Sequence, residues 1–157
     1  STHRSYLDPA KKLVVQSDAS GIGVGAVVLQ EGAAIAFASR RLTPVEKRYS
    51  QIEREFIAIV FALKRFSSLL IGLNFELQTD HAPLLRILKK PLDSVSNRMQ
   101  RWIVAIQHFS FETTHIKGVE NVVADALSRN PIELDVTPDE IAEYTIYALL
   151  LSRSLLI

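Results

Sequence analysis

Two short runs of residues along the chain begin with apolar side chains and end on a carboxylate. Residues 13–18 start with three aliphatic residues and end at Asp18, just before a Ser-Gly turn, which is typical of a buried strand. Residues 75–80 alternate between apolar and polar positions and end at Asp80, which also predicts a strand. Adjacent strands lie about 4.8 Å apart, so as parallel neighbours these two would bring their carboxylates close enough to share divalent cations.

A glycine-rich stretch follows the first strand. Gly21, Gly23 and Gly25 match the glycine spacing of dinucleotide-binding proteins, but the next residues predict a strand where that motif requires a helix. We therefore interpret the stretch as a hairpin in which bare backbone can approach a ligand. With a second turn, the pattern predicts an antiparallel meander made of residues 13–18, 27–30 and 33–38.

Helical periodicity begins after this meander. Ser50 and Glu53 have the spacing of a capping box, which predicts a helix that begins after Ser50 and stops at Gly72. The other predicted elements are a short helix between Pro83 and Pro91, an amphipathic helix over 99–109, a strand over 110–116 and a final helix over 122–129 that Asn121 can cap.

The order of these elements predicts an α/β fold. A strand-helix-strand connection is right-handed in nearly all proteins and makes the two strands parallel neighbours. A five-stranded mixed sheet in the order 3-2-1-4-5, flanked by helices, satisfies this rule without crossing connections. It also places Asp18 and Asp80 at adjacent strand ends, where open sheets bind ligands.

The 157 residues, 48% of them hydrophobic, predict a single domain over residues 13–130. Residues 1–12 form a lead-in segment, and residues 131–157 a tail that we expect to be helical from about 138. The apolar end of this tail is too short to span a bilayer, so no membrane is expected as a partner. Because the chain starts at Ser1 and its one Met is Met99, we expect it to be a segment of a longer polypeptide or a processed product.

The absence of cysteine excludes disulfides and thiolate metal sites and fits a reducing compartment. A net charge of +1 gives no strong electrostatic footprint for nucleic acid. Any such partner must therefore be gripped locally or with the help of another domain.

Four acidic residues could converge at this edge of the sheet and hold two divalent cations for phosphoryl transfer: Asp18, Glu55, Asp80 and Asp125. The capping box already employs Glu53, which favours Glu55 as the helical ligand. Each acid also has an ordinary structural interpretation. Asp18 could be a turn residue, Asp80 a helix cap and Asp125 a solvated helix position.

Several motifs resemble the ribonuclease H domain of gypsy-like LTR retrotransposon reverse transcriptases. The resemblance covers about residues 13–130, and its motifs lie at residues 17–20, 49–63, 79–81, 101–102 and 118–129, the last being GVENVVADALSR. It implies an RNase H-like fold and metal-dependent endonucleolytic cleavage of the RNA strand of RNA/DNA hybrids during reverse transcription. The four acids named above are also those that the resemblance implies as ligands of two Mg²⁺ or Mn²⁺ ions.

The resemblance further implies two partners, an RNA/DNA hybrid and the polymerase domain of the same polyprotein. It aligns His115 with a position on the loop before the last helix, where a histidine could shuttle a proton or help to release product; a satisfied strand-end histidine is the alternative. For each of the candidate phosphate contacts, a solvated surface role is the favoured alternative; the candidates are Arg40, Arg41, Lys47, Arg48, Arg98, Arg101 and Lys117.

Two alternative functions stay open at this stage. One is a non-catalytic scaffolding or nucleic-acid-binding module of the same fold, which would have no reason to keep all four acids. The other is a DNA-directed nuclease of the same fold, because selectivity for RNA requires recognition of the 2′-hydroxyl. Only residues 91–96 fill the place where many cellular relatives insert a basic helix, so we expect weak substrate binding by the isolated chain.

Overall fold

A five-stranded mixed sheet forms the centre of the fold. The structure is a computed structural model that describes residue 8 and residues 10–131. The strand order is β3-β2-β1-β4-β5, as the sequence pattern predicts. β1 pairs antiparallel with β2 and parallel with β4. The strands are β1 (Leu13–Ala19), β2 (Gly23–Gln30), β3 (Ala33–Arg41), β4 (Asn74–Thr79) and β5 (Ser110–His115).

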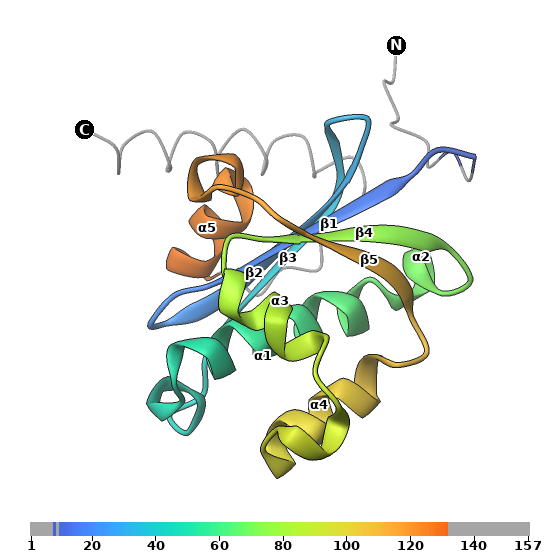
Figure 1. The fold of residues 1–157 in the computed structure, drawn as a ribbon. Coiled ribbons are helices and arrows are strands. Elements are labelled where there is room, and N and C mark those ends of the chain that lie inside the picture. Colours follow the sequence, from blue (N-terminus) through green and yellow to red (C-terminus); the bar gives the residue numbers. More distant parts are fainter. Residues whose placement is uncertain (1–7, 9, 132–157) are drawn as a thin grey trace.

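The helices cover the two faces of the sheet unequally (Figure 1). α1, α3 and α4 lie on one face, whereas α5 lies on the other. In the described part of the chain, no helix is long and apolar enough to span a membrane. The helices are α1 (Gln51–Arg65), α2 (Ser67–Leu70), α3 (Ala82–Leu88), α4 (Asn97–Ile106) and α5 (Val122–Arg129), with 3-10 turns at Glu46–Arg48, Leu92–Ser94 and Gly118–Glu120.

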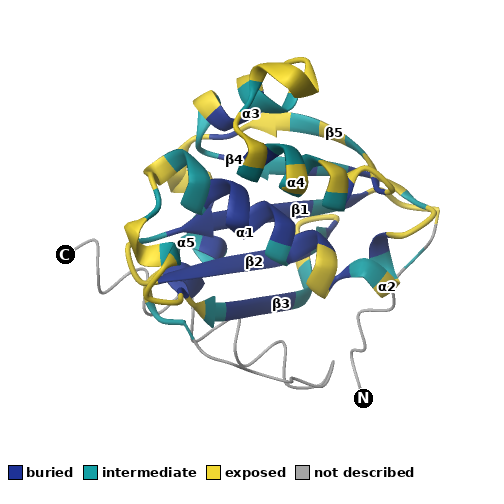
Figure 2. Cartoon of the chain, turned by 90° about the horizontal axis from the view of Figure 1, so that it is seen from below, coloured by how far each residue is buried: buried dark blue, intermediate teal, exposed yellow. Residues whose placement is uncertain are grey.

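The main hydrophobic core lies between α1 and the sheet, where Figure 2 shows the deepest burial. Phe56 and Ile59 from α1 belong to the same buried cluster as Phe75 and Leu77 from β4, and all four side chains are fully buried. Each such side chain contributes about 1.5–3 kcal/mol through removal from water. Helix α1 packs against β1 and β2, and this packing positions the end that carries the site described below.

The first long helix begins as predicted but ends earlier. Ser50 forms the full capping box with Glu53. The helical backbone then breaks at Phe66, and the short helix α2 continues to Leu70 before Gly72 adopts a φ of 83°. The break allows Phe66 and Leu70 to be buried in the same core.

Gly23 and Gly25 make room for a helix rather than for a ligand, which corrects our interpretation of that stretch. A Cβ atom added at Gly25 would lie 2.4 Å from the backbone oxygen of Ala124, and one at Gly23 would lie 2.7 Å from that of Ser128. Helix α5 therefore passes directly over the bare backbone of β2. The helix expected from about residue 138 lies outside the described residues.

Candidate functional site

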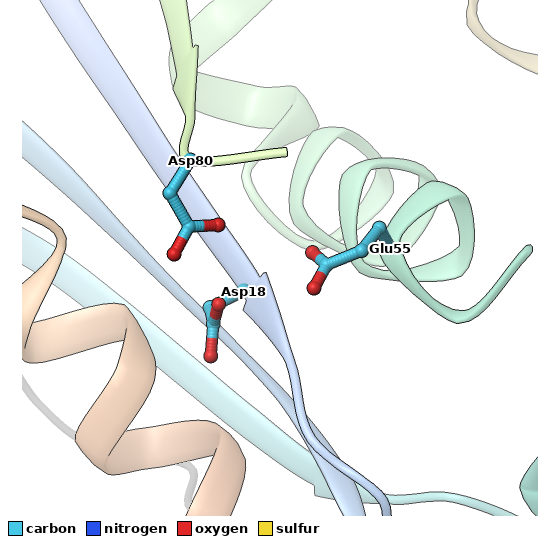
Figure 3. Close-up of side chains that lie close together, drawn as sticks. All are labelled: Asp18, Glu55 and Asp80. Atoms are coloured by element: carbon cyan, nitrogen blue, oxygen red, sulfur yellow. The ribbon is translucent and has the colours of Figure 1, made fainter. Parts of the chain in front are cut away.

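Three carboxylates from separate elements meet at one edge of the sheet (Figure 3). Asp18 lies near the end of β1, Asp80 directly follows β4, and Glu55 lies in the second turn of α1. One oxygen of each lies within 4.8 Å of the others. The parallel register pairs Gln16 with Gln78, and its continuation brings Asp18 beside Asp80.

The two glutamates of the first helical turns have different surroundings. Glu53 Oε1 accepts a hydrogen bond from the backbone N–H of Ser50, and its Oε2 pairs with Arg98 at 2.7 Å. Glu55 instead points toward Asp18 and is only 3% exposed. The capping pattern thus separated the structural glutamate from the one in the cluster.

Burial makes the ionised forms of two of these acids costly. Burial, together with the charges of Asp80 and Asp125, raises the pKa of Asp18 to about 7. Burial and the charges of Asp18 and Asp80 raise the pKa of Glu55 to about 9. A bound cation would relieve both costs.

The donor set fits a divalent metal ion. Gln51 donates to Glu55 Oε1 at 2.9 Å, but the buried Oε2 has no hydrogen-bond partner in the described structure. An unpartnered buried carboxylate oxygen is energetically unfavourable. Carboxylate oxygens are the ligands that Mg²⁺ and Mn²⁺ prefer. The cluster therefore offers the ligand chemistry that such an ion requires.

The fourth predicted acid lies beside this cluster but is not among its close oxygens. Asp125 lines the same cavity of about 280 Å³ as Asp18, Glu55 and Asp80. Its Oδ1 accepts a hydrogen bond from Arg129 Nε at 3.0 Å, and its side chain is 36% exposed. Pairing with a cation is favourable for a carboxylate next to other negative charges. The expected convergence of four acids is therefore seen for three.

Helix α5, which carries Asp125, is attached to the sheet by serine hydroxyls. Ser20 Oγ donates to the backbone oxygen of Ser128, and Ser39 Oγ donates to that of Leu127, both at 2.7 Å. These bonds satisfy carbonyl groups in the last turn of the helix, which have no partner within it. Ser128 Oγ also lies 2.7 Å from Asp18 Oδ2. Ser128 was not among the predicted site residues, although its spacing from Asp125 predicts that both share one helix face.

Asn121 connects the same helix to β1 in a way that the sequence did not predict. It precedes α5, but its side chain makes no capping hydrogen bond. Instead its Nδ2 donates to the backbone oxygen of Ser17 at 3.0 Å, and the residue is fully buried. Asn121 therefore does not cap the helix as expected, but links its start to Ser17, the residue before Asp18.

Residues 8–109 match the protein family described as "RNase H-like domain found in reverse transcriptase". The chain belongs to this family. Over 128 residues, 80% of its length, it is 45% identical to the Pol polyprotein of Drosophila melanogaster transposon 297; with that of transposon gypsy it shares 38% over 125 residues. It spans only 12% of each relative.

Solved structures agree with the predicted RNase H-like fold. The chain resembles LC11-RNase H1 with a TM-score of 0.63 at 20% identity, over 78% of this chain and 96% of that one. It resembles the foamy viral protease-reverse transcriptase in complex with RNA/DNA hybrid with a TM-score of 0.59 at 22% identity, over 71% of this chain and 16% of that one. The predictions of fold and family are confirmed.

In this RNase H-like domain, His115 lies at the rim of the acidic site. It is the last residue of β5 rather than part of the following loop, and it is exposed. Its Nε2 lies 3.1 Å from the backbone oxygen of Asp80, at hydrogen-bonding distance. The ring is thus attached to the cluster through the backbone and not through a carboxylate.

The candidate phosphate contacts fall into two groups. Arg40 forms a bidentate ion pair with Glu46, at 2.8 and 3.0 Å, and Arg98 pairs with Glu53 while its guanidinium lies over the ring of Tyr49. These two arginines therefore have structural partners. The others of the set are exposed: Arg41, Lys47, Arg48, Arg101 and Lys117.

Proposed function

We propose that this domain cleaves the RNA strand of RNA/DNA hybrids with the help of Mg²⁺ or Mn²⁺. The observation that supports this most directly is the meeting of three carboxylates, two of them buried and one half-buried, within 4.8 Å. Membership of a reverse-transcriptase RNase H-like family supports the choice of substrate. The foamy viral enzyme and LC11-RNase H1, which share the fold, have both been solved with an RNA/DNA hybrid.

In this proposal the carboxylates of Asp18, Glu55 and Asp80 hold the ions, and Asp125 completes the set from the same cavity when it leaves Arg129. Two bound divalent cations stabilise the attacking and the leaving oxygen of an in-line displacement. The oxygen of a water molecule bonds to phosphorus, and the bond from phosphorus to the 3′ oxygen breaks. A water proton ends on that 3′ oxygen, leaving 5′-phosphate and 3′-hydroxyl ends. His115, exposed at the rim, is the group that relays this proton.

Substrate binding in this proposal depends on more than the domain itself. The chain carries a net charge of +1, and two of its candidate arginines are already in ion pairs. Exposed Arg41, Arg101 and Lys117 then contribute phosphate contacts. The polymerase domain of the same polyprotein supplies the remaining affinity, since the relatives are about eight times longer than the aligned segment.

The test is cleavage of a labelled RNA/DNA hybrid by the purified chain with Mg²⁺ or Mn²⁺. Asp18→Asn and Asp80→Asn are expected to abolish cleavage, as is EDTA. Asp93→Asn, which changes an exposed carboxylate in the 3-10 turn Leu92–Ser94, serves as the matched control. Retained cleavage in either site variant would refute the assignment. Cleavage of duplex DNA in place of the hybrid would indicate a DNA-directed nuclease, and absence of Mn²⁺ binding a non-catalytic module.

A further inference from the structure

The carboxylate of Asp18 lies in the most crowded part of the cluster. Two other carboxylates lie within 4.8 Å of it, and the residue is 5% exposed. Such a group has to be held in one orientation against repulsion by its neighbours. The hydroxyl of Ser128, at 2.7 Å from Asp18 Oδ2, is placed to do this.

A neutral hydroxyl suits this position better than a cation would. An arginine or lysine beside Asp18 would repel a metal ion, whereas a serine donates a hydrogen bond without adding charge. Ser128 Oγ also lies 2.8 Å from the backbone oxygen of Asp125, the usual local partner of a serine in a helix. One hydroxyl proton serves one acceptor at a time, and an ionised carboxylate accepts the stronger hydrogen bond. The proton therefore belongs to Asp18 when that residue is ionised.

The position of Ser128 is fixed independently of this contact. Ser20 holds its backbone oxygen, Ser39 holds that of Leu127, and the side chain of Ser128 is fully buried. The backbone that carries this hydroxyl is therefore held in place whichever way the Asp18 carboxylate turns. A donor anchored in this way selects one orientation of the carboxylate that it binds.

We infer that Ser128 is a positioning residue, which holds the Asp18 carboxylate in the orientation that binds metal. This inference rests on the proposed function, because it presumes that the acidic cluster holds divalent cations. Removing a hydrogen-bond partner of a metal ligand typically lowers metal affinity by about 10- to 100-fold. Ser128→Ala is expected to weaken Mn²⁺ binding within this range.

The experiment is titration of Mn²⁺ into the full 157-residue chain by calorimetry, without nucleic acid. Ser39→Ala is the matched control, because it also removes a buried hydroxyl that anchors α5, and it does so from β3, which β2 separates from the strand that carries Asp18. Ser128→Cys keeps a weaker donor of similar size and is expected to bind Mn²⁺ with intermediate affinity. Circular dichroism in EDTA checks that each variant is folded. If Ser128→Ala does not fold, the comparison of Ser128→Cys with Ser39→Ala decides.

The outcomes separate this inference from the proposed function. Weak binding by Ser128→Ala, with wild-type-like binding by Ser39→Ala, supports a positioning role. Equal losses in both variants mean that Ser128 acts only by anchoring the helix, and wild-type affinity in Ser128→Ala also overturns the inference. A wild-type chain that binds no Mn²⁺ would instead refute the proposed metal site itself.

Discussion

Replacing Asp18 by asparagine is expected to stabilise the metal-free protein strongly at pH 8 and much less at pH 5. The pKa of Asp18 is about 7 in the folded protein, compared with its ordinary value of 3.8. The folded state therefore binds this proton more tightly than the unfolded state does. The free energy of unfolding consequently falls as pH rises from about 4 through 7.

The magnitude follows from this difference in pKa. A folded-state pKa that is about 3 higher than the unfolded one costs about 4 kcal/mol once the group is fully ionised. Asparagine keeps the size of the side chain and can still accept the hydrogen bond from Ser128, but it carries no charge. We expect Asp18→Asn to raise the free energy of unfolding by about 2–4 kcal/mol at pH 8. At pH 5 the wild-type Asp18 is neutral in the folded protein but already ionised in the unfolded one, so we expect a smaller gain of about 1.5 kcal/mol there.

Urea denaturation in EDTA at the two pH values measures this effect. Mg²⁺ added at pH 8 should stabilise the wild-type chain and leave Asp18→Asn unchanged, because the variant lacks a ligand. Asp93→Asn again controls for loss of an exposed carboxylate. The reasoning is refuted if Asp18→Asn changes stability equally at both pH values, or if it destabilises the metal-free protein at pH 8.

Glu55→Gln should abolish Mn²⁺ binding in calorimetry and stabilise the metal-free chain. Glu53→Ala should still bind Mn²⁺, but its free energy of unfolding should fall by about 1 kcal/mol because the capping box is lost. The reverse pattern would mean that the wrong glutamate was assigned. Gly25→Ala should lower the free energy of unfolding, measured by urea denaturation, by about 1–3 kcal/mol, because the added Cβ meets α5. Gly21→Ala, whose added Cβ has nothing within 4 Å, should change it by no more than about 0.5 kcal/mol. Equal effects of the two substitutions would contradict this packing. Arg101→Ala should weaken hybrid binding and make the slope of log affinity against log salt concentration less steep by about one, the contribution of one phosphate contact. Fluorescence anisotropy at several salt concentrations measures this slope. An unchanged slope would place Arg101 outside the interface.

Local patterns in the sequence were sufficient for the order and type of the elements. Alternating positions predicted β4, and the right-handed crossover rule predicted the sheet order. The capping box distinguished Glu53 from Glu55, because this contact forms between residues three positions apart. Because Glu53 already satisfies a backbone N–H group at the start of the helix, Glu55 is available for other contacts.

Contacts between distant segments were decided only by the tertiary structure. Asp18 and Ser128 are 110 residues apart, and Asn121 and Ser17 are 104 apart, so no local periodicity relates the members of either pair. The same holds for Gly25, where a side chain would collide with a helix that lies about 100 residues further along the chain. Periodicity reveals which face of an element is buried, but not which atoms meet there, because that depends on how closely two backbones approach. The sequence determined that carboxylates gather at one sheet edge. The packing of α5 against the sheet decided that Ser128 supports Asp18.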